Sequence, residues 1–140
     1  MEKNFSVGDA IELVVGGVRY DLHNWYDFEG IVVLSEALAQ LWFRSHNGNE
    51  PSLVLEINGV TDLEVSSGVL MGRCRDVEEI GYKHPSDRDL DWLVAEERST
   101  KRDHLVFRFG IDDYIRIHGE RAGLFTRENS SSLSRLSRLA

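Results

Sequence analysis

The sequence predicts a mainly β protein, either an antiparallel β-sandwich or a partly open barrel of about six to nine strands. Short apolar stretches alternate with polar residues at a period of two, and helical periodicity is scarce. Twelve glycines against two prolines provide for many tight turns. A chain of 140 residues buries roughly 68–70% of its unfolded surface on folding. We therefore expect one β-rich domain over residues 1–125, followed by a tail over residues 126–140.

The first expected element is a hairpin in residues 11–22, IELVVGGVRYDL. A two-residue turn at Gly16–Gly17 suits a type I′ geometry, because glycine tolerates the positive φ angles that this turn needs. Pairing across it places six apolar side chains on one face, which are Ile11, Leu13, Val15, Val18, Tyr20 and Leu22.

A second β region covers residues 41–65. Strands at Leu41–Ser45 and Leu53–Ile57 flank a loop that contains Asn47–Gly48. After Ile57 we expect a three-residue turn, because it pairs Leu55 with Leu63 and keeps one face apolar. The same register pairs Leu53 with Val65.

The third pair lies in residues 104–119, HLVFRFGIDDYIRIHG. A three-residue loop pairs Phe107 with Ile115, and a five-residue loop also matches the faces, so the sequence leaves the loop length open. With the shorter loop, His104 stands opposite His118 on the outward face, where two imidazoles are weak candidates for a metal site.

Residues 84–92, HPSDRDLDW, place an aspartate at every second position. An EF-hand loop that starts at Asp87 needs glycine at its sixth position and glutamate at its twelfth, where this chain has Trp92 and Arg98. A helix over residues 87–98 explains more, with Ser86 as its cap and the aspartates near the positive end of its dipole. We therefore predict one short α-helix there and no metal ion.

The stretch YDLHNWYDFEG, residues 20–30, is the main candidate binding site. It mixes aromatic rings with carboxylates at the exit of the first hairpin, a combination that can grip a basic side chain, a cation or a sugar. Core packing of Trp25 and Phe28 remains the alternative. The candidate binding residues are Asp21, His23, Trp25, Tyr26, Asp27, Phe28 and Glu29.

Motifs for catalysis, for metal binding and for phosphate binding are lacking. The five histidines are isolated in sequence, and none of the common nucleophile or glycine-rich nucleotide-binding motifs occurs. Cys74 lies between two arginines, but we expect a structural thiol. No catalytic residue and no cofactor is therefore assigned.

The formal charge of −8 is unevenly distributed. The tail from Thr126 onward carries +2, which leaves −10 on the rest of the chain. An acidic body disfavours nucleic-acid binding and favours a basic partner. A lone cysteine and the lack of a membrane-length apolar run fit a cytoplasmic protein that does not enter a membrane.

Together these observations favour a non-enzymatic protein-binding module. In size, acidity and lack of motifs the chain resembles bacterial immunity proteins, although no alignable motif supports the likeness; it implies an inhibitor of a basic toxin. The alternative is an enzyme or small-molecule carrier with its ligand in the mouth of a barrel, using Asp21, His23, Glu29 and His118. The Ser/Arg/Leu tail is expected to dock on the body or to form a homodimer.

Overall fold

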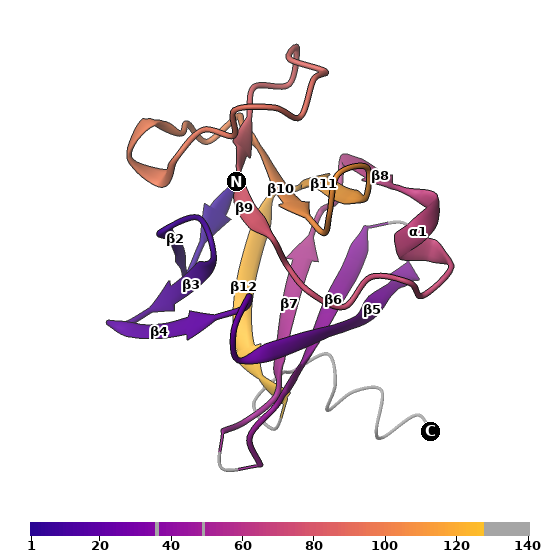
Figure 1. The fold of residues 1–140 in the computed structure, drawn as a ribbon. Helices are drawn as coiled ribbons and strands as arrows, with labels where there is room; N and C mark the ends of the chain where they lie inside the picture. The colour runs from indigo at the N-terminus through magenta and orange to yellow at the C-terminus, as the bar shows by residue number, and fades with distance from the viewer. Residues whose placement is uncertain (36, 49, 128–140) are drawn as a thin grey trace.

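The computed structural model describes residues 1–35, 37–48 and 50–127 (Figure 1). The first sheet contains, in spatial order, β1 (Glu2–Lys3), β12 (Arg121–Thr126), β7 (Leu53–Asn58), β6 (Leu38–Ser45) and β5 (Tyr26–Ser35). The second contains β8 (Asp62–Val65), β11 (Tyr114–His118), β10 (His104–Arg108) and β9 (Glu79–Lys83). The third contains β2 (Ser6–Gly8), β3 (Glu12–Val15) and β4 (Val18–Asp21).

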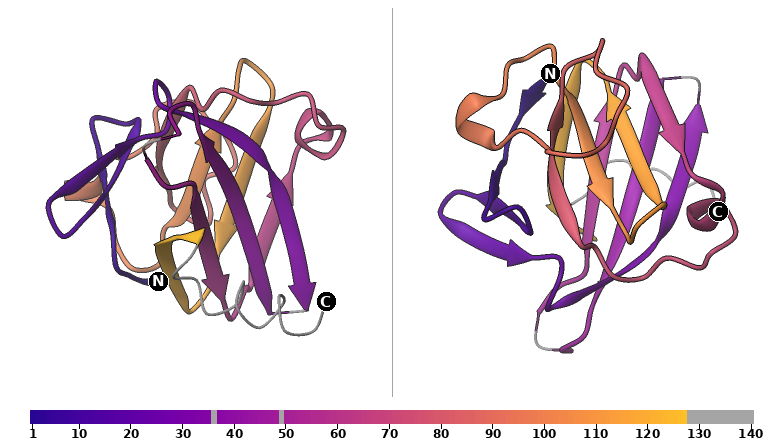
Figure 2. Two further views of the ribbon diagram at one scale, coloured as in Figure 1. Left: turned by 90° about the horizontal axis from the view of Figure 1, so that it is seen from below. Right: turned by 45° about the horizontal axis from the view of Figure 1, so that its top comes forward.

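The first and second sheets form two layers, with the third sheet beside them (Figure 2). One buried cluster draws side chains from all three, among them Leu13 of β3, Phe43 of β6 and Phe107 of β10. The rings of Phe43 and Phe107 meet across the layers with centroids 6.2 Å apart. The mainly β prediction is thus confirmed, and the arrangement is that of a β-sandwich. No helix among the described residues has the length and apolar content needed to cross a membrane.

Two hairpins follow the register expected from the sequence. β3 pairs with β4 across Gly16 and Gly17, whose φ angles of 55° and 83° suit the predicted turn. β10 pairs with β11, and the N–H of Phe109 donates to the carbonyl of Asp113 at 2.9 Å. That bond sets the register of a three-residue loop and resolves the choice that the sequence left open.

The predicted pairing of β7 with β8 is wrong. β7 has β6 on one edge and β12 on the other, so neither edge is free for β8. β8 joins the second sheet instead, where Leu63 lies opposite Ile117 and Val65 opposite Ile115. The apolar face of β8 therefore matches a partner that comes some 50 residues later in the chain.

The predicted helix over residues 87–98 is also wrong. The single α-helix of the described residues is α1 (Ser67–Leu70), and the 87–98 segment contains only a 3₁₀ turn, η1 (Glu96–Arg98). Residues 84–95 form an irregular loop whose backbone is held by side chains of the second sheet. These contacts replace the hydrogen bonds that a helix would make within itself.

The two ends of the described chain lie side by side. β1 runs parallel to β12, the single parallel pair among the described strands. The side chain of Asn4 donates to the carbonyl of Leu124 at 3.0 Å and accepts from its N–H at 2.8 Å. Most of the tail predicted for docking or dimer formation, residues 128–140, lies outside the described residues.

Candidate functional site

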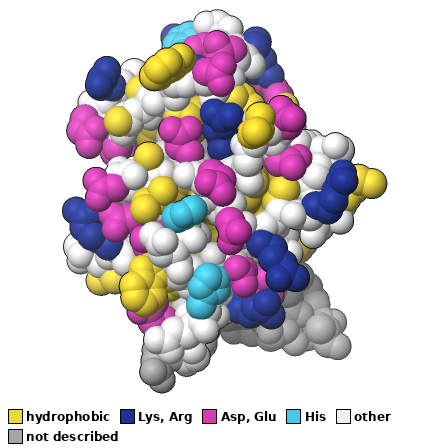
Figure 3. Space-filling view, in the orientation of Figure 1, with side chains coloured by type: hydrophobic (Ala, Val, Ile, Leu, Met, Phe, Trp, Pro, Cys, Tyr) yellow, Lys and Arg dark blue, Asp and Glu magenta, His cyan; other side chains and the backbone are white. Residues whose placement is uncertain are grey.

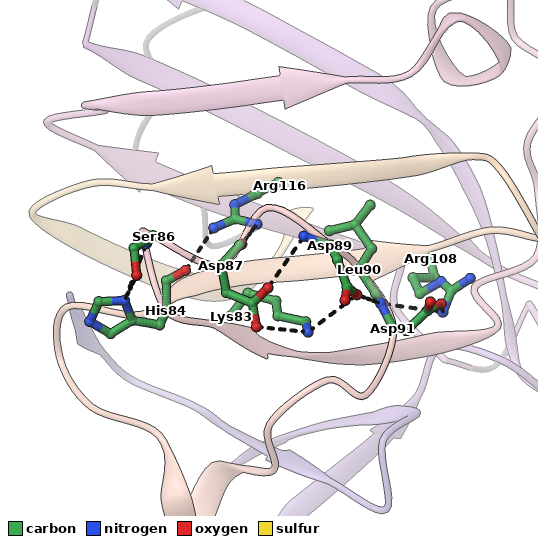
Figure 4. Close-up of polar contacts among 9 residues, drawn as sticks. All are labelled: Lys83, His84, Ser86, Asp87, Asp89, Leu90, Asp91, Arg108 and Arg116. Atoms are coloured by element: carbon green, nitrogen blue, oxygen red, sulfur yellow. Dashed lines mark hydrogen bonds and ion pairs between the residues drawn. The ribbon is translucent and has the colours of Figure 1, made fainter.

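The loop of residues 84–95 covers one side of the second sheet, and Arg116 of β11 anchors it (Figure 4). The side chain of Arg116 is 1% exposed. Its guanidinium donates to the carbonyl of Asp87 at 2.7 Å and to that of His84 at 2.9 Å. Its Nε donates to Nδ1 of His104 at 2.9 Å. A buried cation thus binds backbone carbonyls, which fixes the start of the loop.

The aspartates at alternate positions have a structural role in this loop. Nζ of the buried Lys83 lies 3.2 Å from a carboxylate oxygen of Asp87 and 3.7 Å from one of Asp89 (Figure 4). Oδ1 of Asp87 accepts the N–H of Asp89, and Oδ1 of Asp89 accepts the N–H of Asp91. Each carboxylate therefore supports the backbone two residues further on, as in an Asx turn. The hydrogen bond from Lys83 lowers the pKa of Asp87.

Hydrogen bonds also anchor the C-terminal end of the 84–95 loop. The backbones of Val94 and Tyr82 exchange hydrogen bonds of 2.8 and 2.9 Å. The hydroxyl of Tyr82 donates to Glu96 at 2.6 Å, and Glu96 also binds Lys3 at 2.8 Å. Residues between these two anchors are displayed by a backbone with little freedom to move.

Arg108 of β10 joins this loop to the turn between β10 and β11. Its Nη1 donates to the carbonyl of Leu90 at 3.2 Å, and its Nη2 donates to the carbonyl of Ile111 at 3.3 Å. The same guanidinium lies 3.8 Å from Asp91 and 3.9 Å from Glu79. One cation thus holds two loops in a fixed relation.

Each of these loops exposes a large apolar side chain. Trp92 is 91% exposed and Ile111 is 90% exposed. The φ angle of Trp92 is 59°, in the left-handed region that is unfavourable for a bulky residue. Such strain persists only where the surroundings enforce it, and it is concentrated at functional sites. We give the name Trp92 surface to five of the exposed residues of these loops, which are Asp89, Asp91, Trp92, Ile111 and Asp112. Arg88 is also exposed on the first loop and pairs with Glu64.

The stretch 20–30 does not form the single surface that the sequence suggested. Tyr26 and Phe28 are buried, and the ring of Phe28 packs against Phe43 at a centroid distance of 5.6 Å. Trp25 is 50% exposed. Strand alternation in β5 explains the division, because residues 26 and 28 face the core while residues 27 and 29 face outward.

The polar residues of that stretch already have hydrogen-bond or ion-pair partners within the protein. Asp21 accepts the N–H groups of His23 and Asn24 at 3.0 and 2.9 Å, which closes the turn after β4. Nδ1 of His23 lies 2.7 Å from the carbonyl of Val77. Asp27 pairs with His46 at 2.9 Å, and Glu29 pairs with Arg127.

The four groups considered for an enzyme or carrier are therefore dispersed. Asp21 and His23 lie together after β4, whereas Glu29 contacts Arg127 and His118 lies 3.2 Å from the carbonyl of Asp103. Among the described residues, no hydrogen bond or ion pair joins Asp21 or His23 to Glu29 or His118.

His104 and His118 do stand opposite each other, with ring centroids 5.2 Å apart. The loop covers this face, however, and His104 is buried. Because a guanidinium N–H can only donate, Nδ1 of His104 must accept, so His104 is neutral. Burial and the charge of Arg116 lower its pKa. Among the described residues no group of three or more His, Cys, Asp or Glu could hold a metal ion.

Cys74 is buried, as expected for a structural thiol. Burial and the neighbouring carboxylate of Asp113 raise its pKa to about 11. The thiolate, which is the nucleophilic form, is therefore scarce at neutral pH.

Charge is mixed rather than concentrated on the face that Figure 3 shows, where acidic and basic side chains alternate. The Trp92 surface was not predicted, because the sequence pattern indicated a helix over this segment. No local signal singled out Trp92, which stands beside Leu90, Leu93 and Val94 in the sequence. Comparisons with protein-family models, with curated proteins and with solved structures gave no match to this chain.

Proposed function

We propose that this protein is a non-enzymatic binding module that recognises a basic protein partner through the Trp92 surface. The observation that carries this proposal is Trp92 itself, almost fully exposed on a strained backbone between two anchored points. The stability of the fold does not require an exposed tryptophan. Tryptophan is, however, enriched among the residues that contribute most of the binding energy at protein interfaces.

The size of the side chain supports a role as an anchor. Burying a tryptophan at an interface removes 150–250 Å² from water, worth roughly 4–6 kcal/mol before the costs of association. The anchoring of the loop keeps those costs low, because little conformational freedom remains to be lost on binding. Ile111, which is 90% exposed on the adjoining loop, would extend the apolar contact.

The charge of the surface supports a basic partner. Asp89, Asp91 and Asp112 are exposed around the two apolar side chains. The body carries −10, and such a field accelerates the approach of a positively charged protein. An inhibitor or immunity-type protein for a basic toxin is the more specific form of the proposal.

The proposal can be tested with random 12-residue peptides displayed on phage and selected on the intact protein. We expect the selected peptides to combine Arg or Lys with an apolar residue. Calorimetry with the same synthetic peptides should show at least a tenfold loss of affinity for Trp92→Ala. Trp25→Ala is the matched control, since it removes another exposed tryptophan, and it should change affinity less than twofold.

A second variant guards against a folding artefact. Trp92→Gly removes the same ring and also relieves the left-handed strain, so it should remain folded and bind as weakly as Trp92→Ala. The proposal fails if selection yields no basic peptides, or if Trp25→Ala and Trp92→Ala weaken binding equally.

A further inference from the structure

The outer edge of β5 is a feature that neither the core nor the Trp92 surface explains. β5 is the last strand of the first sheet, and its sole strand partner among the described residues is β6. The N–H of Phe28 donates to the carbonyl of Arg75 at 2.8 Å, which closes the first part of this edge. From residue 30 to residue 35 the described chain makes no further backbone hydrogen bond on that side. These residues therefore present the unpaired backbone groups of an open strand.

The other edges of the three sheets are short, charged or covered. β1 has two residues, and β8 has four residues that include the exposed Asp62. β9 is covered by its hydrogen bonds with Val94, and Val7 of β2 donates its N–H to Glu96 at 2.7 Å. β4 has four residues, among them the exposed Arg19. Natural β proteins use such devices to keep edges from pairing with other chains.

β5 lacks this protection over its second half. The strand has ten residues, and its stretch from residue 30 to residue 35, GIVVLS, contains no charged residue and no proline. Its pairing with β6 is regular from Gly30 to Val33, between the two register shifts of the strand. A long, uncharged and regular edge of this kind readily accepts another strand.

Apolar side chains are exposed along the same edge. Val32 is 39% exposed and Val33 is 59% exposed. Val33 lies opposite the buried Ala39 and so shares the core-facing side of the sheet, which means that the packed layers end before this part of β5. α1 lies beside β5 (Figure 1), and Leu70 and the following Met71 are 70% and 69% exposed. Two neighbouring elements thus carry four exposed apolar side chains.

The neutrality of the edge favours a second copy of this chain as its partner. The chain carries a charge of −8, so two copies repel each other wherever their acidic residues meet. Residues 30–35 let two copies approach without that cost, because no charged side chain lies among them. For the same reason this stretch offers no carboxylate to a basic protein, in contrast to the Trp92 surface.

We propose that the protein forms a homodimer in which the β5 strands of two copies pair antiparallel about a twofold axis near Val32 and Val33. A strand that pairs with itself in this way sets apolar side chains of one copy against those of the other. The two five-stranded sheets then form one continuous sheet of ten strands. Because the pairing uses the edge of both copies, the assembly closes at two and no open edge remains at β5. This dimer is independent of the function proposed for the Trp92 surface.

Sedimentation velocity of the full chain over a hundredfold range of concentration tests for this dimer, and we expect a reversible monomer–dimer equilibrium. Val33→Lys places a charge on the edge and should raise the dissociation constant of the dimer at least tenfold. Val18→Lys is the matched control, since Val18 is 51% exposed on the edge strand β4. It makes the same change in net charge and should alter the constant less than twofold. Urea denaturation checks that both variants are folded.

Hydrogen exchange of the unsubstituted chain reports the pairing directly. Amides of residues 31–34 should exchange at least threefold more slowly when the concentration is raised into the dimeric range, whereas residues 18–21 should not change. A monomer at every concentration overturns the proposal. The same holds for a dimer that Val33→Lys weakens no more than Val18→Lys does, or for one that leaves the exchange of residues 31–34 unchanged.

Discussion

Residues 20–30 and 84–92 are the two stretches in which aspartates and aromatic rings mix, yet the protein uses them in opposite ways. In the first, Tyr26 and Phe28 are buried and the carboxylates pair with nearby side chains. In the second, the carboxylates support the backbone and the aromatic ring of Trp92 is exposed. Composition alone therefore does not tell which stretch presents an aromatic side chain to a partner.

The difference comes from what lies beneath each stretch. β5 is a strand of the first sheet, and its alternate side chains must fill the core. The 84–95 loop lies on a sheet face whose inner layer is polar, where Lys83, His104 and Arg116 are buried. Such a layer satisfies carbonyls and carboxylates and leaves no apolar space for the indole.

The largest expected effect is a difference in stability between variants of Phe28 and of Trp92. Phe28→Ala should lower the free energy of unfolding by about 3–5 kcal/mol, because it leaves a cavity in the core. Trp92→Ala should change it by less than about 0.5 kcal/mol, as exposed substitutions usually do. Urea denaturation measures both, and equal losses for the two variants would contradict the assignment of Trp92 to the surface.

Substitution of Arg116 should alter residues 84–92 without altering residues 20–30. Arg116→Ala should cost about 2–4 kcal/mol, since it leaves the buried His104 and two partly buried carbonyls without their donor. Hydrogen exchange should rise in residues 84–92 and stay unchanged in residues 20–30. Arg116→Met keeps the volume but not the donors, and full stability in that variant would show that packing, not hydrogen bonding, holds the loop.

The smallest expected effect is a pH dependence confined to the second loop. Burial and Arg116 lower the pKa of His104, and Asp62 opposes them, while His118 and Arg88 add to the lowering. Because the folded-state pKa is below the ordinary 6.5, the unfolded chain binds the proton more readily. The stabilisation is complete above pH 6.5 and is lost as the pH falls toward the folded-state pKa.

Hydrogen exchange at a series of pH values checks this prediction. Protection of residues 84–92 should decrease below pH 6.5, while residues 20–30 serve as the internal control. His104→Gln keeps an acceptor for Arg116 but does not titrate, so its protection should not follow the same curve. An identical pH profile in this variant would assign the dependence to another group.

Local patterns in the sequence were sufficient to predict two hairpins, β3 with β4 and β10 with β11. Gly16–Gly17 defines a turn whose flanking strands are adjacent in the chain, and the alternation from His104 to His118 defines a second pair in the same way. The pairings of β7 with β12 and of β8 with β11 join segments far apart in sequence. Nothing in the local pattern of β8 distinguishes its true partner from β7.

The error over residues 87–98 has a different origin. Ser86 and the aspartates are residues that cap helices, but the same side chains also close Asx turns. The choice between these outcomes was made by Lys83 and Arg116, which reach the segment from the sheet below. Because burial of Arg116 depends on the whole fold, the candidate site could not be located before the strands were assembled.

The position of β12 sets the order in which the first sheet can be completed during synthesis. β6 and β7 are adjacent in the chain and can pair early, but the other edge of β7 stays open until residues 121–126 leave the ribosome. For about 60 residues of translation, an apolar strand edge is available to other nascent chains. A prematurely terminated product would retain that open edge and would be prone to aggregate.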